Sequence, residues 1–170
     1  TSKIICEDIR NFNIQESFDL IFIGFNSLAH LLKNQDLFDC LKSIKSHMSP
    51  KTIFAIDLFV PDPSFLYKDS NDEVDIMDFI ESKTNEKLII FESTNYNYKN
   101  EINTIKWKFK NKLNTNVFEY TFNMRMFFPD TLNRLLIESQ FYIDSFYGDY
   151  DYNQFDENSE KQIYLCKSNI

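Results

Sequence analysis

Apolar runs and helically spaced apolar positions alternate along the first sixty residues. The run at 18–25 (FDLIFIGF) is apolar on both faces, which is typical of a central parallel strand. Apolar side chains then recur at helical spacing over about 33–48, and a second apolar run at 52–60 (TIFAIDLFV) stops before Pro61. This order predicts a right-handed βαβ unit, and a short apolar run at 3–6 predicts one more strand before it.

The pattern changes in the middle of the chain. Residues 70–85 are acidic, and we expect them to be helical or loose. Three extended segments follow between 88 and 128, and in the central one (INTIKWKFK) apolar residues alternate with lysines. Such alternation indicates strands with one wet face, and therefore an antiparallel layer. Pro129 is well placed to open a helix, and two more strand-like runs close the chain.

Composition narrows the function classes. The 170 residues are enough for one domain with a sizeable core. Gly24 and Gly148 are the only glycines, so the chain has no Gly-rich phosphate loop. A net charge of −8 argues against nucleic-acid and anionic-membrane partners. The three cysteines show neither disulfide nor zinc-ligand spacing, and no signal peptide or membrane-length apolar run is evident, so we expect a cytoplasmic protein without a metal site.

Three stretches, in this order, carry a resemblance to a known family. They are IICEDIRNF at 4–12, FDLIFIGFNSLAHL at 18–31, and MRMFFPDTLNRLLIESQFYIDSFYGDYD at 124–151 followed by KQIYLCK. Together they resemble the later portion of class I S-adenosylmethionine-dependent methyltransferases. The Asn-Ser-x-Ala-His-Leu pattern and the late Gly-Asp are similar to glycine N-methyltransferase and related small-molecule N-methyltransferases.

The resemblance implies an α/β, Rossmann-like methyltransferase sheet in a single partial domain over 1–170, with an antiparallel β insertion at about 86–127. The family's Gly-rich cofactor loop and its second strand have no counterpart here. We therefore expect the sheet to lack its first two strands and the strand at 18–25 to form an apolar edge. Three explanations remain open: a fragment of a larger enzyme, one half of a split enzyme complemented by an N-terminal fragment, or a non-catalytic remnant acting through protein association. A homodimer contact through the insertion is also open.

The resemblance further implies that the cofactor is S-adenosylmethionine. Asp8 would accept a hydrogen bond from the adenine amine, and Ile9 would offer backbone contact and apolar packing to the ring. The backbone of Gly24 and Phe25 would meet the methionine moiety, and His30 would help to hold its amino-acid end. Ligands of open α/β sheets bind beyond the carboxyl ends of the strands, where these residues are predicted to lie.

Some of these side chains also fit purely structural roles. Asp8 can cap a helix or pair with Arg10, and Asn26 can cap the helix that follows it. Asp57 ends a predicted strand, where it fits a site and a turn equally well.

The expected methyl acceptor is a small molecule, methylated at nitrogen, with Asn26 facing it. In glycine-type enzymes an Arg clamps the substrate carboxylate after the strand that here reads IDLFVPD, a stretch without a cation, which argues against glycine. Trp107 and Tyr147 favour a larger or amine-bearing substrate, since aromatic faces attract cations. Arg125 is interpreted first as a structural ion-pair partner and second as a pocket residue.

The chemistry asks little of side chains. Methyl transfer is an in-line displacement that depends mainly on positioning and on exclusion of water. A general base helps when the acceptor is protonated, and His30 and Tyr147 are weak candidates for that role.

Overall fold

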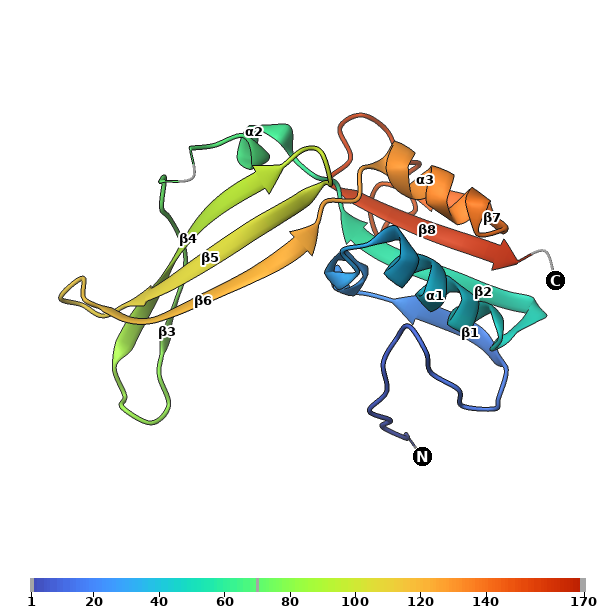
Figure 1. Cartoon of the computed structure of the whole chain (residues 1–170), viewed down its shortest axis with the longest axis horizontal. Coiled ribbons are helices and arrows are strands. Elements are labelled where there is room, and N and C mark those ends of the chain that lie inside the picture. The colour runs from blue at the N-terminus through green and yellow to red at the C-terminus, as the bar shows by residue number, and fades with distance from the viewer. Residues whose placement is uncertain (1, 70, 169–170) are drawn as a thin grey trace. The chain divides into compact units, whose positions relative to one another are not determined.

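The computed structural model describes residues 2–69 and 71–168, and these fall into two compact units (Figure 1). Unit 1 combines the residues up to Val60 with those from Phe127 onward, and unit 2 is the segment Pro61–Met126 between them. No helix in the described part of the chain is long and apolar enough to cross a membrane.

A four-stranded sheet with the order β1-β2-β8-β7 forms the centre of unit 1. Its strands are β1 Phe18–Ile23, β2 Met48–Phe59, β7 Phe141–Tyr147 and β8 Lys161–Ser168. β1 and β2 run parallel, as predicted for a βαβ unit, and β8 is antiparallel to both of its neighbours. β1 is an edge of the sheet, which confirms that this apolar strand has one side unpaired within the described residues.

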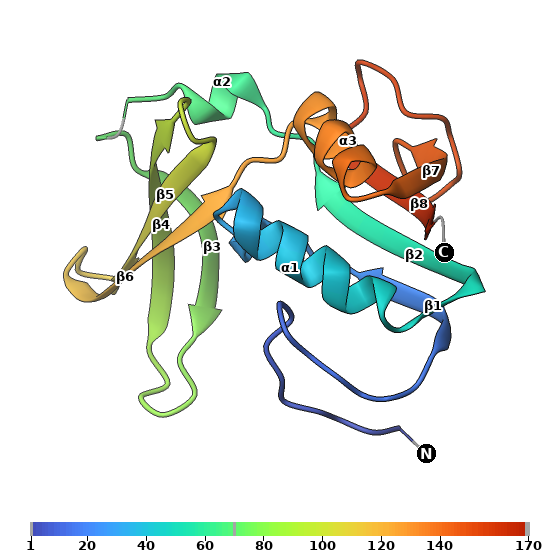
Figure 2. The ribbon, with the colours of Figure 1, turned by 45° about the vertical axis from the view of Figure 1, so that its right-hand side comes forward.

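Two helices cover one face of this sheet. α1 (Asn34–Lys45) and α3 (Pro129–Glu138) both lie in front of the strands in Figure 2, and the short 3₁₀ helix η1 (Ser27–His30) precedes α1. Both helices turn apolar stripes inward, and every second residue at the end of β2 is buried with them. The core of unit 1 includes Leu37, Leu41, Ile44, Phe54, Ile56, Leu58, Leu132, Leu135, Leu136 and Tyr164.

The opposite face of the same sheet is also apolar, but neither α1 nor α3 lies against it. Leu20 and Phe22 of β1 alternate with the core positions and are 58% and 70% exposed. By register, this open face comprises Leu20, Phe22, Ile53, Ala55, Ile163 and Leu165. Sheets with parallel strands normally have both faces covered, so an apolar face left in contact with water is unusual.

Unit 2 is built on a separate antiparallel sheet with the order β3-β4-β5-β6. Its elements are the helix α2 Pro63–Leu66 and the strands β3 Val74–Ile80, β4 Lys87–Asn97, β5 Ile102–Lys110 and β6 Asn116–Arg125. The predicted alternation is confirmed: lysines of β5 line one face, where Lys106 pairs with Glu119 and Lys110 with Glu73.

Two predictions for individual elements were wrong. Residues 3–6 form no strand, because no neighbouring segment offers them a hydrogen-bonding ladder, and Ile4 is 97% exposed. The segment 70–85 is not helical or loose throughout: Val74–Ile80 pairs with β4, and its Asp78 binds Lys87 on the wet face. The antiparallel layer therefore has four strands and begins at Val74 rather than near 86.

Candidate functional site

The chain makes a strained bend directly after β1. Phe25 and Asn26 have φ angles of 54° and 58°, so two consecutive non-glycine residues adopt the left-handed conformation. This conformation is costly for side chains larger than glycine, and above all for a bulky one. The Phe25 side chain nevertheless lies 95% exposed, so burial of the ring does not offset the cost. Strain of this kind persists where surrounding contacts impose it, and it concentrates at ligand sites.

The end of β2 supplies those contacts. The Asn26 side-chain oxygen accepts a 2.8 Å hydrogen bond from the backbone N–H of Phe59. Asp57 acts twice: its carbonyl accepts from the N–H of Asn26 at 3.3 Å, and its carboxylate Oδ2 accepts from the N–H of Phe25 at 3.4 Å. Asn26 makes no side-chain cap to η1, so the capping role considered for it is not the one observed. The bend is thus tied to the carboxyl end of β2.

A third segment reaches the same place from the loop after β7. Tyr150 donates a 3.0 Å hydrogen bond through its hydroxyl to Oδ2 of Asp57. The preceding turn is built tightly: a Cβ on Gly148 would lie 2.1 Å from Oγ of Ser159, so only glycine fits there. The Asp149 carboxylate accepts from the Asn153 side chain at 2.7 Å, and this bond is the main reason that the pKa of Asp149 is lowered.

Sequence reasoning missed Tyr150. It identified the Gly-Asp pair before it and favoured Tyr147 instead. Tyr147 is the last residue of β7, half-buried, and its ring meets that of Tyr152 edge-on at 5.5 Å. The sequence signal for Tyr150 is the run Gly-Asp-Tyr-Asp, because Gly and Asp favour a turn and Tyr150 directly follows them.

Asp8 lies in a coil turn rather than at the tip of a strand. Its carboxylate forms an ion pair with Arg10, with 2.7 Å between Oδ2 and Nη2, and Arg10 also pairs with Asp36 of α1 at 3.0 Å. The hydrogen bonds from Arg10 lower the pKa of Asp8 to about 2. The structural alternative, a pair with Arg10, is therefore present, while the Asp8 side chain remains 51% exposed and within reach of a ligand. Ile9 beside it is half-buried.

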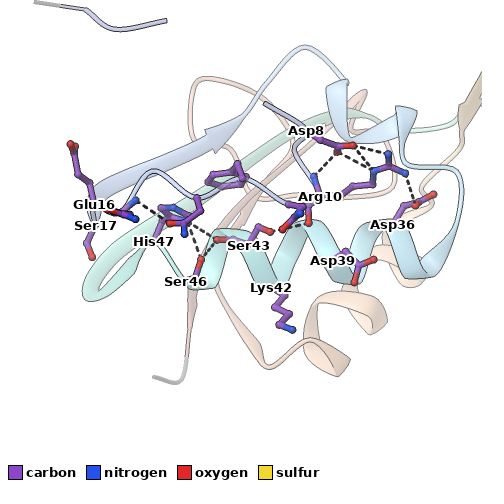
Figure 3. Close-up of a pocket in the computed structure, with 14 residues that line it drawn as sticks. Asp8, Arg10, Glu16, Ser17, Asp36, Asp39, Lys42, Ser43, Ser46 and His47 are labelled. Carbon is purple, nitrogen blue, oxygen red and sulfur yellow. Dashed lines mark hydrogen bonds and ion pairs between the residues drawn. The ribbon is translucent and has the colours of Figure 1, made fainter. Parts of the chain in front are cut away.

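A polar cavity of about 860 Å³ lies between the coil 8–17 and α1, and Figure 3 shows its lining. His47 pins this coil. Its Nε2 accepts from the N–H of Ile14 at 2.9 Å, and its Nδ1 lies 2.7 Å from the carbonyl of Ser43, to which it donates. The ring is 2% exposed and stacks on Phe12 at 4.5 Å. Of the residues predicted to bind cofactor, Asp8 alone lines the cavity, so this cavity and the bend after β1 are different places on unit 1.

The remaining predicted residues lie on separate elements. His30 ends η1 and is exposed. In unit 2, Arg125 at the end of β6 is 6% exposed and pairs with Glu101 at 3.4 Å, which fits the structural role considered first for it. Trp107 on β5 donates through Nε1 to Oε2 of Glu92 at 2.6 Å. Among the described residues, no group of three or more His, Cys, Asp or Glu side chains is placed to hold a metal ion.

Solved structures share this fold. A S-adenosylmethionine-dependent methyltransferase from Clostridium acetobutylicum is 18% identical with a TM-score of 0.73, over 99% of this chain and 65% of that one. The methyltransferase CcbJ from Streptomyces caelestis is 12% identical with a TM-score of 0.76, over 96% and 62%. The sugar N-methyltransferase KedS8 from Streptoalloteichus is 10% identical with a TM-score of 0.66, over 95% and 60%.

No protein-family model and no curated protein matches the sequence. The chain spans between 60% and 65% of the length of these three structures, and each of them aligns with nearly all of it. The chain therefore has the class I S-adenosylmethionine-dependent methyltransferase fold, and it corresponds to part of the length of these solved structures.

Proposed function

We propose that this protein is a S-adenosylmethionine-dependent methyltransferase that acts on a nitrogen atom of a small molecule. The observation that carries the proposal is the bend at Phe25 and Asn26, which Asp57 and Phe59 hold in a strained conformation. It lies at the carboxyl ends of β1 and β2, where open α/β sheets bind their ligands. Among the structural neighbours, KedS8 is described as a sugar N-methyltransferase and MtfA as a glycopeptide N-methyltransferase, which supports nitrogen as the acceptor atom.

The residues predicted to bind the cofactor fit it in part, although they lie at two different places on unit 1. The Asp8 carboxylate is half exposed and can accept from the adenine amine, although Arg10 already occupies some of its acceptor positions. Ile9 would pack on the adenine ring. The backbone of Gly24 and Phe25 would meet the methionine moiety, with His30 near its amino-acid end.

When bound, S-adenosylmethionine supplies the methyl group, and the task of the chain is to orient the two reactants and to exclude water. Asn26 faces the acceptor in this proposal. Tyr147 of the same unit offers it aromatic surface. A general base at His30 or Tyr147 is not required for the transfer itself.

We infer that further polypeptide completes unit 1, because an apolar edge and an apolar face occur on the same sheet. Within the part of the chain that the structure describes, β1 has an unpaired side, and the open face beside it bears Leu20 and Phe22 in contact with water. Unpaired edge strands pair readily with other chains. In this proposal the strands that come first in the family sheet lie outside the 170 residues, either in a longer chain or in a complementing fragment.

Backbone amide NMR spectra of the 170-residue chain, recorded while S-adenosylmethionine is added, test the proposal. We expect weak, saturable shifts that cluster at 8–9, 24–30 and 57–59. Asn26→Ala should abolish the shifts, while Ile137→Ala, an exposed change on α3, should leave them intact. Shifts confined to other regions, or none at millimolar cofactor, would contradict a cofactor site at this bend.

A further inference from the structure

One face of the unit 2 sheet is lined with aromatic rings. Paired residues of antiparallel strands share a face, and the register places Trp107 opposite Tyr120 and Phe109 opposite Phe118. On the neighbouring strand β4, Glu92 is paired with Trp107 and therefore lies on the same face of the sheet. We call this the aromatic face, and it comprises Phe79, Trp107, Phe109, Phe118, Tyr120 and Phe122 together with Glu92.

The rings are ordered around Trp107 and partly open to water. Trp107 meets Phe122 edge-on at 5.1 Å and Phe109 at 6.5 Å. Tyr120 and Phe118 are 52% and 57% exposed. These contacts fix the orientation of the indole, and the neighbouring rings still present accessible π surface.

Glu92 is an unusual residue on this aromatic face because it is charged. Within the described residues of β3 to β6, it is the one charged side chain on the aromatic face, and it is half-buried. The half-buried indole N–H of Trp107 needs an acceptor, but a neutral side chain would provide one without the cost of removing a carboxylate from water. A carboxylate placed there instead gives the aromatic face a negative charge.

No lysine of the neighbouring strands balances that charge on this face. Lys106, Lys108 and Lys110 alternate with the aromatic positions, so they lie on the opposite face, where Glu73 and Glu119 bind them. Glu92 accepts the indole N–H of Trp107 through Oε2. A carboxylate beside ring faces is complementary to an organic cation, which gains from both the charge and the π surface.

We propose that the aromatic face of unit 2 binds an organic ammonium ion, with Glu92 as counter-charge and Trp107 and Tyr120 as π surfaces. This binding does not depend on the function proposed above, because it follows from the charge and the rings of unit 2 alone.

The chain offers a direct reporter, since Trp107 is its single tryptophan. Choline serves as the probe, and its carbon isostere, in which a tert-butyl group replaces the trimethylammonium, serves as the neutral control. We expect choline to change the Trp107 emission saturably and the isostere to bind at least five-fold more weakly. Equal responses to the two probes, or no saturable response, would overturn the proposal.

Glu92→Gln is the matched variant, because the amide oxygen can still accept from the indole while the charge is lost. It should weaken choline binding at least five-fold. Unchanged affinity would overturn the role of Glu92.

Emission and sedimentation measured over a range of protein concentrations test whether a second copy of the chain occupies the aromatic face. A concentration-dependent change in both, abolished by Tyr120→Ser, would show that a second copy covers the face and would equally overturn the proposal. Cofactor-induced NMR shifts at the β1 bend are a separate readout, so failure here leaves the proposed methyltransferase function standing.

Discussion

The Tyr150 hydroxyl lies 3.0 Å from Oδ2 of Asp57, and this same oxygen accepts from the backbone N–H of Phe25. One carboxylate therefore links the strained bend after β1 to the loop after β7. Since the bend is the centre of the candidate cofactor site, the strength of this link decides how firmly the site is held before any ligand arrives.

The link can be measured as a coupling energy. Tyr150→Phe and Asp57→Asn each weaken it, and because Tyr150 is 63% exposed we expect each variant to lose no more than about 1 kcal/mol of unfolding free energy. In urea unfolding, the double variant should lose less than the sum of the single losses, with a coupling of about 0.5 kcal/mol. Strict additivity would show that the two groups do not interact in solution.

Relief of backbone strain should be visible at Phe25. Gly adopts φ near 54° freely, whereas Ala does not, so Phe25→Gly should be about 1 kcal/mol more stable than Phe25→Ala in urea unfolding. Phe22, an exposed residue inside β1, is the control position. There the order should reverse, because glycine weakens a regular strand. The same order at both positions would argue against strain at the bend.

Acid should loosen the turn at Asp8. The pKa of this carboxyl is lowered to about 2 in the folded chain by hydrogen bonds from Arg10, compared with about 3.9 for an unperturbed Asp. A lowered folded-state pKa gives stability that is complete above the unfolded value and is lost as the pH falls through the folded value. NMR titration of the Asp8 carboxyl should therefore find the turn opening between about pH 4 and 2. Asp8→Asn should remove this transition, and a carboxyl that titrates near 3.9 would refute the Arg10 pair.

His47 should control the order of the coil 8–17. His47→Ala leaves the Ile14 N–H without its acceptor and removes the ring beneath Phe12, so we expect a loss of about 1–3 kcal/mol of stability. Hydrogen exchange at the Ile14 amide should become much faster. His30→Ala is the matched control, because His30 is exposed, and it should change neither quantity. Slow exchange at Ile14 in the His47 variant would contradict the pinning.

The thiols should differ sharply in reactivity. Cys40 and Cys166 are buried, and desolvation raises the pKa of each to about 12, whereas Cys6 is exposed. The thiolate is the reactive form, so a thiol reagent at pH 8 should label Cys6 alone in the native chain and all three cysteines in denaturant. Cys6→Ser should leave the native chain unlabelled. Rapid native labelling of Cys166 would contradict its burial between the β2 and β7 strands.

The elements predicted correctly are those whose own pattern decides them. β1 and β2 are apolar runs with a helical repeat between them, and β5 alternates lysine with apolar residues, so local pattern and final environment agree. β3 failed this test, because its acidic residues look helical or loose until β4 provides a partner and a cation for Asp78. The segment 3–6 failed in the opposite way, since a strand-like run forms no strand without a neighbour.

The candidate site was predictable only as a location. The ends of β1 and β2 follow from the parallel unit, and Asn26 and Asp57 were identified there. Tyr150 was not, because its contact with Asp57 joins residues that are 93 positions apart and depends on a turn that sequence pattern does not orient. The left-handed Phe25 is equally invisible in sequence, since no rule places a bulky residue in that conformation.

Gln162 explains how unit 1 can accommodate a large insertion. Its buried side-chain amide donates to the carbonyl of Phe59 at 2.8 Å and to that of Phe127 at 2.6 Å. Phe59 precedes the point where the chain leaves unit 1, and Phe127 is the residue at which it returns. Gln162 therefore holds both ends of the insertion in place within unit 1. The segment between them is thereby a replaceable module. Evolution or a designer can shorten, exchange or diversify it while the parallel sheet keeps its own anchor.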